Sequence, residues 1–383
     1  MSHPKLNGYH HPSICATTDL GLIHQLIVFM PQILSPDEFF NAPGIILDVR
    51  SPAEYAHGHI PGAVSFPLFS DDERAQVGTC YKQQGKDLAI ELGLTIVGSK
   101  LTQFVQTAKK LSPDHPIRLH CWRGGMRSSS MAWLLETAGM QVSLLEGGHK
   151  AFRQWVRSTL ATPQAIVTLG GMTGTGKTIL LNALAERGEQ ILDLEHLANH
   201  RGSSYGSLGL PPQPSNEHYE NLLAVQWVSL DRDRPVWIEA ESSRVGLCRV
   251  PDEIFLRMVE SPVVQIERSR SERIAILLEV YGSADPEELI AATQRISKKL
   301  GGQNTQAAIA HIREGNLAPA IETVLDYYDK SYLYDLMKRE VAIYPIDVSG
   351  LSDSESVDRL IDKSREILSE KQVSAQELVI NRK

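Results

Sequence analysis

The chain has 383 residues, with 46 acidic and 38 basic side chains and a formal net charge of -8. Its length predicts two domains rather than one, and its acidic balance argues against nonspecific coating of nucleic acid but allows a local basic site. The four cysteines, at positions 15, 80, 121 and 248, lie too far apart for a zinc site and are too sparse for a disulfide framework, which favours a reducing compartment. The apolar run at 20–30 is too short to cross a bilayer and lacks the flanks of a signal peptide. We therefore expect a cytoplasmic protein with no membrane partner.

Residues 1–30 carry no clear pattern and are interpreted as an N-terminal extension. From residue 45 the sequence alternates between strand and helix patterns. Strands are predicted at 45–49, 63–68, 117–121 and 142–147, and helices open at 51 and span 99–111, 129–138 and 151–160. Ser51, Pro52 and Glu54 have the order of a helix start, with a cap, a proline and an acid that reaches back. The alternation predicts an α/β fold with a parallel sheet covered on both faces.

The segment 160–164 interrupts this pattern, and a second α/β unit begins with the apolar run "AIVTL" at 165. Further strands are predicted in 235–242 and just before Asp193, and the sequence after 285 is mostly helical, including 322–340. We expect an extension over 1–30, a first domain over 31–160, and a second domain over 164–383 whose C-terminal part is helical.

The stretch "RLHCWRGGMRSSSMAW" (118–133) places a lone cysteine at the end of a predicted strand, where ligands gather in parallel sheets. Glycines let backbone N–H groups turn inward, and together with arginines and the next helix start they favour an anion in the loop. Such a setting lowers a thiol pKa below about 8.5, so we predict a nucleophilic or group-carrying cysteine rather than a buried structural thiol. Residues 128–130 are candidate caps for the next helix. The anion-cradling loop comprises Cys121, Arg123, Gly124, Gly125, Met126, Arg127 and Ser128.

The stretch "ILDVRSPAEYAHGHIPGAVSFPL" (46–68), the cysteine loop and "LLEGGHKAFRQW" (144–155) together resemble a rhodanese domain over about residues 35–158. The resemblance implies that Cys121 carries the transferred chalcogen. Five residues separate Cys121 from Arg127, where many rhodaneses have four, and this spacing also resembles the phosphate loop of dual-specificity and tyrosine phosphatases. A loop of this size has room for a tetrahedral phosphate or a heavier chalcogen. The residues that the resemblance assigns to the scaffold are Asp48, Arg50, Glu54, His59 and Gly62.

The stretch "GGMTGTGKT" (170–178) follows an apolar strand and precedes the helical pattern "ILLNALAERG", which is the setting of a phosphate-binding P-loop. Backbone N–H groups of such a loop surround phosphate oxygens, its lysine adds positive charge and its threonine can hold Mg²⁺. Nothing in the sequence specifies a nucleotide base, and a diphosphate without a base satisfies the same loop. The predicted phosphate-binding residues are Gly171, Gly174, Thr175, Gly176, Lys177 and Thr178, with Thr178 the candidate Mg²⁺ ligand.

Charged residues follow two further predicted strands of the second domain. "QILDLEHLANHRGSSYG" (190–206) contributes Asp193, Glu195 and Arg201, and "PVWIEAES" (235–242) contributes Glu239 and Glu241. The carboxylates are candidates to act at the P-loop through Mg²⁺ or a water. Solvated strand ends are the structural alternative for both stretches.

A rhodanese-like half joined to a P-loop half narrows the possibilities. With "DDERAQVGTCYKQQG" (71–85), "IEAES" (238–242) and "YYDKSY" (327–332), these motifs resemble the bacterial tRNA 2-selenouridine synthase family over nearly the whole chain after residue 35. The resemblance implies a rhodanese-like domain followed by a P-loop NTPase-like α/β domain. It also implies a tRNA-modifying transferase that converts wobble 2-thiouridine to 2-selenouridine through an S-geranylated intermediate, and that is therefore a geranyltransferase as well.

The same resemblance names the co-substrates as selenophosphate and geranyl diphosphate, with Mg²⁺ assisting and no tightly bound cofactor. The P-loop would hold the diphosphate leaving group, whose developing charge Lys177 neutralises. Cys121 would take selenium from selenophosphate, carry it as a selenylsulfide and deliver it to the base. The implied partners are tRNA and, transiently, an enzyme that produces selenophosphate.

A tRNA substrate requires a basic surface. Residues 118–157 contain six basic side chains against two acidic ones, and "ERSRSER" (267–273) adds three arginines. Trp122 is a candidate to stack on an extruded wobble base, with packing beneath the loop as the alternative. For the three arginines the alternative is a helix face salt-bridged to Glu267 and Glu272. The candidate tRNA-binding residues are Trp122, Arg153, Arg157, Arg268, Arg270 and Arg273.

Other functions fit parts of the sequence. An ATP-dependent tRNA sulfurtransferase of the rhodanese type would make thiouridine and would need a nucleotide pocket. A phosphatase joined to a small-molecule kinase would explain the Cys-x5-Arg spacing, but no aspartate in an obvious adjacent loop is placed to protonate a leaving alcohol. A phosphate-sensing module without catalysis would leave both motifs idle. For a geranyl chain, "EIFLRMV" (253–259) and "IAILLEV" (274–280) are candidates that the sequence does not distinguish from core helices.

Overall fold

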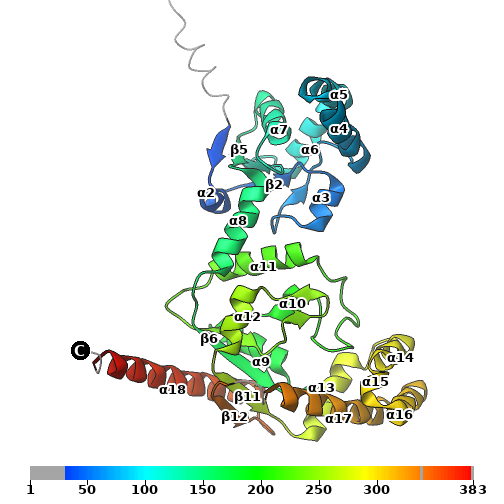
Figure 1. The fold of residues 1–383 in the computed structure, drawn as a ribbon, viewed down its shortest axis with the longest axis vertical. Helices are drawn as coiled ribbons and strands as arrows, with labels where there is room; N and C mark the ends of the chain where they lie inside the picture. Colours follow the sequence, from blue (N-terminus) through cyan, green and yellow to red (C-terminus); the bar gives the residue numbers. More distant parts are fainter. Residues whose placement is uncertain (1–30, 337–339, 381–383) are drawn as a thin grey trace, which may run out of the picture. The chain divides into compact units, whose positions relative to one another are not determined.

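The computed structural model describes residues 31–336 and 340–380, which form two compact units (Figure 1). Unit 1 comprises residues 31–51 and 64–148, and unit 2 comprises 52–63 together with the described residues from 149 onward. The predicted extension over 1–30 lies outside the described residues. The domain limits at 160 and 164 stay predictions.

Unit 1 is built on a five-stranded parallel sheet with the strand order β1-β5-β4-β2-β3. Buried side chains of the sheet and of two helices form its core, among them Leu47, Leu119, Ala108 and Met131. The predicted parallel sheet is confirmed, although the strand expected at 63–68 is only two residues long. The elements are β1 (Gln32–Leu34), α2 (Pro36–Asn41), β2 (Ile45–Asp48), β3 (Val64–Ser65), α4 (Asp71–Gln84), α5 (Lys86–Gly98), α6 (Leu101–Leu111), β4 (Ile117–His120), α7 (Met126–Thr137) and β5 (Val142–Leu145).

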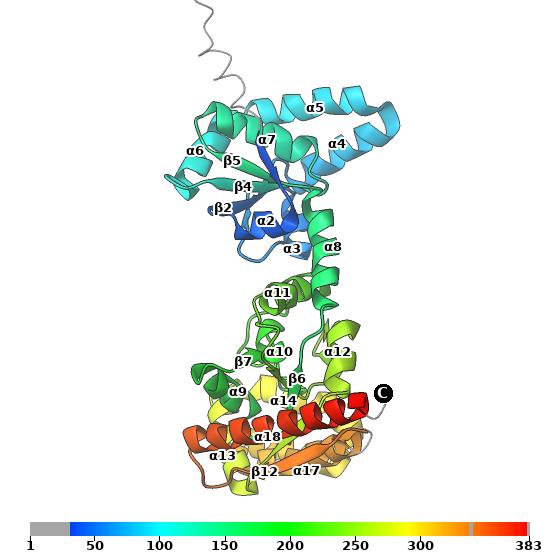
Figure 2. The ribbon, with the colours of Figure 1, turned by 90° about the vertical axis from the view of Figure 1, so that its left-hand side faces the viewer.

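Two helices that the sequence patterns do not predict, α4 and α5, form the hairpin that Figure 2 shows. α4 begins with a capping box, because Ser70 Oγ accepts from Glu73 N at 3.2 Å and the Glu73 carboxylate accepts from Ser70 N at 2.8 Å. Its only buried side chain is Cys80, so the apolar period that reveals a helix is missing. Among the described residues no single helix is long and apolar enough to cross a membrane, although α5 and α6, bent by 64°, meet the length and composition together.

Unit 2 contains a second five-stranded parallel sheet, with the strand order β12-β11-β6-β8-β7, and an antiparallel pair, β9 and β10. The P-loop strand β6 lies at its centre, between β11 and β8. Its strands are β6 (Ile166–Gly171), β7 (Gln190–Leu192), β8 (Val236–Glu239), β9 (Arg244–Val245), β10 (Cys248–Arg249), β11 (Val263–Glu267) and β12 (Ile343–Asp347).

The helices of unit 2 fall into those that cover the sheet and those that gather after residue 270. Side chains of α9 and α18 share a buried cluster with the sheet strands. Helices α13 to α17 lie together in Figure 1, and some of them form separate apolar clusters around Leu289, Ile312 and Val324. The helical C-terminal part is thus confirmed, with 337–339 outside the described residues. The helices are α3 (Pro52–His57), α8 (Gly148–Leu160), α9 (Lys177–Glu186), α10 (Leu194–Leu197), α11 (Asn216–Val228), α12 (Asp252–Val259), α13 (Arg270–Tyr281), α14 (Pro286–Arg295), α15 (Ser297–Leu300), α16 (Gly302–Arg313), α17 (Leu317–Leu336) and α18 (Asp353–Ile380).

A buried ion pair lies at the carboxyl edge of the unit 1 sheet. Asp48, the last residue of β2, accepts from Arg50 Nε at 3.0 Å and from an Arg50 terminal nitrogen at 2.6 Å, and neither side chain is more than 1% exposed. His120 Nε2 lies 3.6 Å from Asp48 Oδ2 on the neighbouring strand. Burial raises the pKa of Asp48, but His120 and Arg50 outweigh burial and hold this pKa below its usual value. Asp48 therefore keeps a guanidinium neutralised inside the domain.

We expect Asp48→Asn to lower the free energy of unfolding of unit 1 by about 3–5 kcal/mol, because Arg50 is left buried without a counter-charge. Hydrogen exchange of β2 and β4 amides across a urea series measures this locally. Asp358→Asn, which breaks the exposed pair with Arg187, is the control and should change stability by less than about 1 kcal/mol. Equal effects of the two variants would contradict the expectation.

Candidate active site

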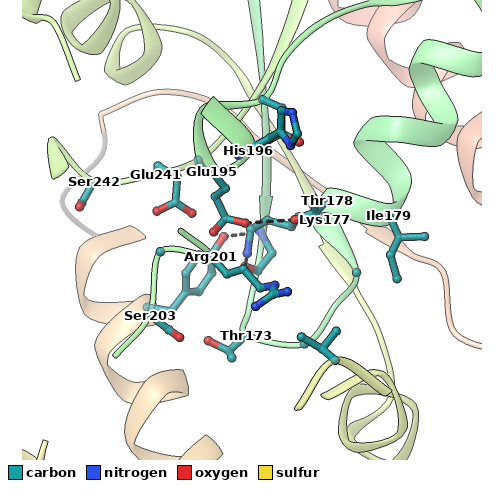
Figure 3. A pocket seen from close by; sticks show the side chains of 18 of the residues that line it. Thr173, Lys177, Thr178, Ile179, Glu195, His196, Arg201, Ser203, Glu241 and Ser242 are labelled. Atoms are coloured by element: carbon teal, nitrogen blue, oxygen red, sulfur yellow. Dashed lines mark hydrogen bonds between the residues drawn. The ribbon is translucent and has the colours of Figure 1, made fainter. Parts of the chain in front are cut away.

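A cavity of about 1160 Å³ surrounds the P-loop at the carboxyl end of the unit 2 sheet (Figure 3). β6 ends at Gly171 and α9 begins at Lys177, so the loop has the strand–loop–helix setting that its sequence indicated. Gly174 and Gly176 have φ of +82° and +84°, the left-handed region that favours glycine. A Cβ on Gly174 would also lie 2.9 Å from Arg273 O, so a side chain there has no room. The loop backbone thus depends on glycine at these positions.

The polar side chains of the P-loop turn toward carboxylates of two neighbouring strand ends. Lys177 Nζ donates to Gly171 O at 3.0 Å, and Thr178 Oγ1 donates to Glu195 Oε2 at 3.1 Å. Figure 3 shows Lys177, Thr178, Glu195, Arg201 and Glu241 around the same cavity. The structure therefore brings the predicted lysine, threonine, arginine and two of the acids together.

The other two predicted acids, Asp193 and Glu239, are buried. Asp193 lines the same cavity and caps α10, where its side chain accepts from His196 N at 2.7 Å. Glu239 is fully buried, and its Oε1 accepts from Glu195 N at 3.0 Å. Burial, with Asp193 and Glu195 nearby, raises the pKa of Glu239 well above its usual value. Glu239 therefore binds the Glu195 backbone from a buried position in which ionisation is disfavoured.

Glu195 is the titratable centre of the cavity. Burial, Glu241 and Asp193 together raise its pKa to about 8, against the opposing effects of Lys177 and the Thr178 hydroxyl. The carboxylates of Glu195 and Glu241 approach one another closely, because a Cβ on Gly202 would lie 2.8 Å from an oxygen of each. Together with Asp193, these acids outnumber Lys177 and Arg201 around the cavity, which leaves an excess of negative charge when all three ionise.

A divalent cation fits this surplus. Mg²⁺ takes oxygen ligands and is commonly held by one or two carboxylates together with substrate phosphates. Thr178 and Glu195 offer such oxygens beside the loop, and the buried Glu239 Oε2 has no hydrogen-bond partner among the described residues. No group of three or more His, Cys, Asp or Glu side chains in 31–336 and 340–380 has the arrangement of a complete metal centre. Phosphate oxygens of a ligand would have to complete the coordination.

The position of Arg273 argues against its predicted contact with tRNA. This side chain is buried, its Nε donates to Thr173 O at 2.9 Å, and its guanidinium forms a bidentate ion pair with Asp329 of α17. A guanidinium in this position is not available to a nucleic-acid backbone. It instead fixes the P-loop to α13 and α17.

The remaining candidate arginines for tRNA binding differ in the contacts that their guanidinium groups make within the protein. Arg270 pairs with Glu322 and Asp326 of α17, rather than with Glu267 and Glu272 as the helix-face alternative expected. Arg268 has two buried guanidinium nitrogens without a hydrogen-bond partner in the described part of the chain.

Two arginines of α8 also differ from one another. Arg153 is engaged by Asn221 and by the carboxylate of Glu220 within unit 2. Arg157 is exposed. Of the predicted arginine contacts on α8 and α13, Arg157 is therefore exposed, Arg270 is exposed but paired, and Arg153 and Arg273 are bound by neighbouring side chains.

The cysteine loop of unit 1 follows β4 and packs against backbone. Gly124 has a φ of +64°, and a Cβ there would lie 3.1 Å from Leu145 O and 3.2 Å from Gly147 N. Glycine is therefore required both by conformation and by the close approach of the turn after β5. Trp122 and Arg123 are exposed, and Arg127 is half-buried. Packing of Trp122 beneath the loop is not what the structure shows.

Cys121 itself lies beneath the loop, with only 3% of its surface exposed. Ser128 Oγ donates to Cys121 Sγ at 3.2 Å and to Gly125 O at 3.1 Å. The prediction that Ser128 to Ser130 cap the next helix is wrong, since α7 begins at Met126 with Gly125 in the cap position. Ser128 instead binds the sulfur, a contact that the sequence did not indicate.

Sequence reasoning missed several residues of the P-loop cavity. Tyr332 OH accepts from Gly171 N at 2.8 Å, and Tyr328 lines the cavity beside it. Both belong to the stretch 327–332, which the resemblance marked without a role. Their positions one helical turn apart on α17 were the available signal.

We expect the pH dependence of stability to change in Glu195→Gln. Folded Glu195 keeps its proton up to about pH 8 while the unfolded chain loses it near pH 4.5, so wild-type stability falls as pH rises through this window. The variant cannot ionise, and its advantage over wild type should grow by up to about 4 kcal/mol between pH 5 and pH 9. Urea unfolding at several pH values measures this, with the exposed Glu253→Gln as the control for removing one charge. A difference that stays constant with pH would contradict the assignment.

The chain matches two known families. Residues 37–154 match the rhodanese-like domain, and residues 164–358 match the tRNA 2-selenouridine synthase AAA domain. The chain is therefore an α/β protein with a rhodanese-like domain followed by a P-loop domain.

Curated relatives carry one name. A protein of Marinobacter nauticus named tRNA 2-selenouridine synthase is 36% identical over 77% of this chain and 89% of its own length. Proteins of the same name from Bordetella petrii and Pseudomonas putida are each 36% identical, over 80% and 76% of this chain and 90% and 87% of their own lengths. These matches extend over both the cysteine loop and the P-loop, and the chain belongs to the tRNA 2-selenouridine synthase family.

Proposed function

We propose that this chain replaces the sulfur of wobble 2-thiouridine in tRNA by selenium, after S-geranylation of that sulfur by geranyl diphosphate and with selenophosphate as selenium donor. The observation that carries the proposal is the presence of two anion-binding loops of different construction. The P-loop combines amides, Lys177 and a carboxylate cluster, which suits a diphosphate with Mg²⁺. The cysteine loop carries backbone amides, Arg123 and Arg127 in the segment that follows Cys121, a set of donors that would suit a single phosphate-like group.

The P-loop would serve the first step. The sulfur of 2-thiouridine attacks C1 of geranyl diphosphate, the C1–O bond breaks, diphosphate leaves with the electron pair, and the base gives up the proton of N3. Lys177 and the loop amides would stabilise the charge that develops on the leaving group. Bound at Thr178, Mg²⁺ would add positive charge there. The step converts a thiocarbonyl, which is a poor leaving group, into a thioether that can depart as a thiol.

The cysteine loop would serve the second step. The selenium of selenophosphate attacks C2 of the base, the C2–S bond breaks, and geranyl thiolate leaves and takes a proton. Water then cleaves the Se–P bond and releases phosphate. Arg123, Arg127 and the backbone N–H groups around Gly124 and Gly125 would hold the phosphate part of the donor.

The oxidation state of selenium in the donor and in the product bears on the role of Cys121. Selenium has the selenide oxidation level in selenophosphate and in 2-selenouridine, so direct exchange requires no redox step. Carriage as a selenylsulfide, the role implied by the family resemblance, would oxidise selenium and release phosphorus as phosphite. With its sulfur 3% exposed and bonded to Ser128, Cys121 fits a role in shaping the donor site better than carriage. Analysis of the phosphorus product distinguishes the two routes, since phosphate supports direct transfer and phosphite supports the carrier.

We expect Lys177→Ala to lower the rate of S-geranylation of thiolated tRNA by about 10²–10³-fold, as for loss of one transition-state charge contact. Nucleoside mass spectrometry of the tRNA measures the geranylated product, and selenation of tRNA that is already geranylated should survive. Lys298→Ala, an exposed lysine of α15, is the control. Undiminished geranylation in Lys177→Ala would remove the P-loop from this step.

Cys121→Ser should have the opposite pattern, with geranylation retained and conversion of geranylated tRNA to selenouridine reduced at least 100-fold. The sulfur accepts from Ser128 Oγ, and the smaller serine hydroxyl on its shorter bond cannot reproduce this volume and contact. Cys80→Ser on α4 is the matched control. Normal selenation by Cys121→Ser would refute any part for this sulfur.

An ATP-dependent tRNA sulfurtransferase remains the alternative for the same P-loop. It requires ATP turnover, so ADP released in proportion to modified tRNA would favour it. Modification that proceeds in nucleotide-free protein with geranyl diphosphate would favour the proposal above.

A further inference from the structure

We propose that a small apolar cavity next to the P-loop binds the distal isoprene unit of the geranyl chain, an inference that rests on the proposed function. This tail cavity has a volume of about 60 Å³ and lies among α13, α14, α16 and α17 of unit 2. Its lining includes Tyr205, Leu277, Leu289, Ile312, Ala320 and Val324.

The tail cavity adjoins the P-loop cavity, because both are lined by Thr173, Leu277, Tyr281 and Tyr328. Thr173 belongs to the P-loop itself. Leu277 touches the loop backbone, since a Cβ on Gly174 would lie 3.0 Å from its Cγ. A chain attached to a diphosphate in the loop therefore meets apolar side chains directly beside the phosphates.

The three tyrosines of the tail cavity offer a ligand their rings rather than their hydroxyls. Tyr205 OH lies 2.8 Å from Thr293 Oγ1, and Tyr328 OH accepts from Ser204 N at 3.1 Å. Tyr281 is hydrogen-bonded to Ser203. With these groups already paired, the walls favour a hydrocarbon, and the other polar lining residues are Thr173 and Ser203, which also line the P-loop cavity.

The volume suits one isoprene unit. A group the size of water occupies about 10–15 Å³ on this scale, so 60 Å³ admits roughly four to six carbon atoms. The first isoprene unit would then lie in the larger cavity along Ile276 and Tyr281, and the second in the tail cavity. The size of the tail cavity would therefore select a ligand by the length of its hydrocarbon chain.

A second apolar groove, of about 1030 Å³, lies in unit 1 between the α4–α5 hairpin and α7. It borders the cysteine loop at Met126 and Arg127 and exposes Trp133. The groove shares no lining residue with the P-loop cavity or with the tail cavity. The groove therefore supplies the control variant.

The test is calorimetric titration of the full chain with Mg²⁺ and four ligands: pyrophosphate and the dimethylallyl, geranyl and farnesyl diphosphates. Wild type should bind geranyl diphosphate at least tenfold more tightly than dimethylallyl diphosphate. Ala320→Leu, which fills the tail cavity, should weaken geranyl diphosphate at least tenfold and change pyrophosphate and dimethylallyl diphosphate by less than twofold. Trp133→Ala should leave all four affinities unchanged.

Enlarging the cavity gives a test in the opposite direction. Leu289→Ala should raise the affinity for farnesyl diphosphate relative to geranyl diphosphate at least fivefold. Thermal unfolding and pyrophosphate binding show whether each variant is folded, and if Ala320→Leu is not, the chain-length ratio of Leu289→Ala decides.

The results of these titrations distinguish failure of the tail-cavity inference from failure of the proposed function. If wild type binds geranyl diphosphate no more tightly than pyrophosphate, the proposed function fails. If wild type discriminates by chain length but Ala320→Leu and Leu289→Ala do not alter the ratios, the tail cavity alone is wrong. A loss of geranyl affinity in Trp133→Ala, with Ala320→Leu normal, would place the chain in unit 1.

Discussion

The buried guanidinium of Arg273 is the contact on which the unit 2 site depends. It binds the carbonyl of Thr173 in the P-loop and the carboxylate of Asp329 in α17, while its own backbone lies in α13. A planar group with five donors can meet both partners at once, which a lysine cannot. Since Arg273 is buried, loss of Asp329 would leave its charge without a partner or solvent. The P-loop and the helices around it are thus held as one structure.

The carboxylates around the P-loop impose a second constraint. Glu195 and Glu239 have raised pKa values because burial and their neighbours penalise ionisation, and only Lys177 and hydrogen bonds oppose this. A site that crowds acids beside a phosphate-binding loop is electrostatically unfavourable without a cation. Under the proposed function, the same crowding would make the site responsive to Mg²⁺ bound with a diphosphate, because a cation would convert repulsion among the acids into coordination.

Both loops and the two parallel sheets could be predicted from local signals, because strand alternation and glycine-rich loops after apolar runs are short-range patterns. Lys177, Thr178 and Glu195 could be predicted to share a site for the same reason, since parallel strand ends meet at one edge. Arg273, Tyr332 and Asp329 could not, because their contacts join segments 56 or more positions apart. The basic stretch at 267–273 was therefore interpreted as a surface, whereas the structure buries one arginine and pairs another. Likewise, α4 could not be predicted, because it buries almost no apolar side chain.

One face of α13 carries one residue that holds the P-loop and another that forms the apolar wall beside it. Arg273 and Leu277 are four positions apart, so they lie one above the other on the helix. The first fixes the loop that would bind phosphates, and the second forms the apolar wall that starts beside Gly174. A nucleotide would bring a polar base and sugar to that wall, where the tyrosine hydroxyls are already paired and the desolvated groups would find no partners. A prenyl diphosphate would instead place its hydrocarbon chain against that wall. The arrangement of this helix therefore favours a hydrocarbon-bearing diphosphate over ATP at the same P-loop.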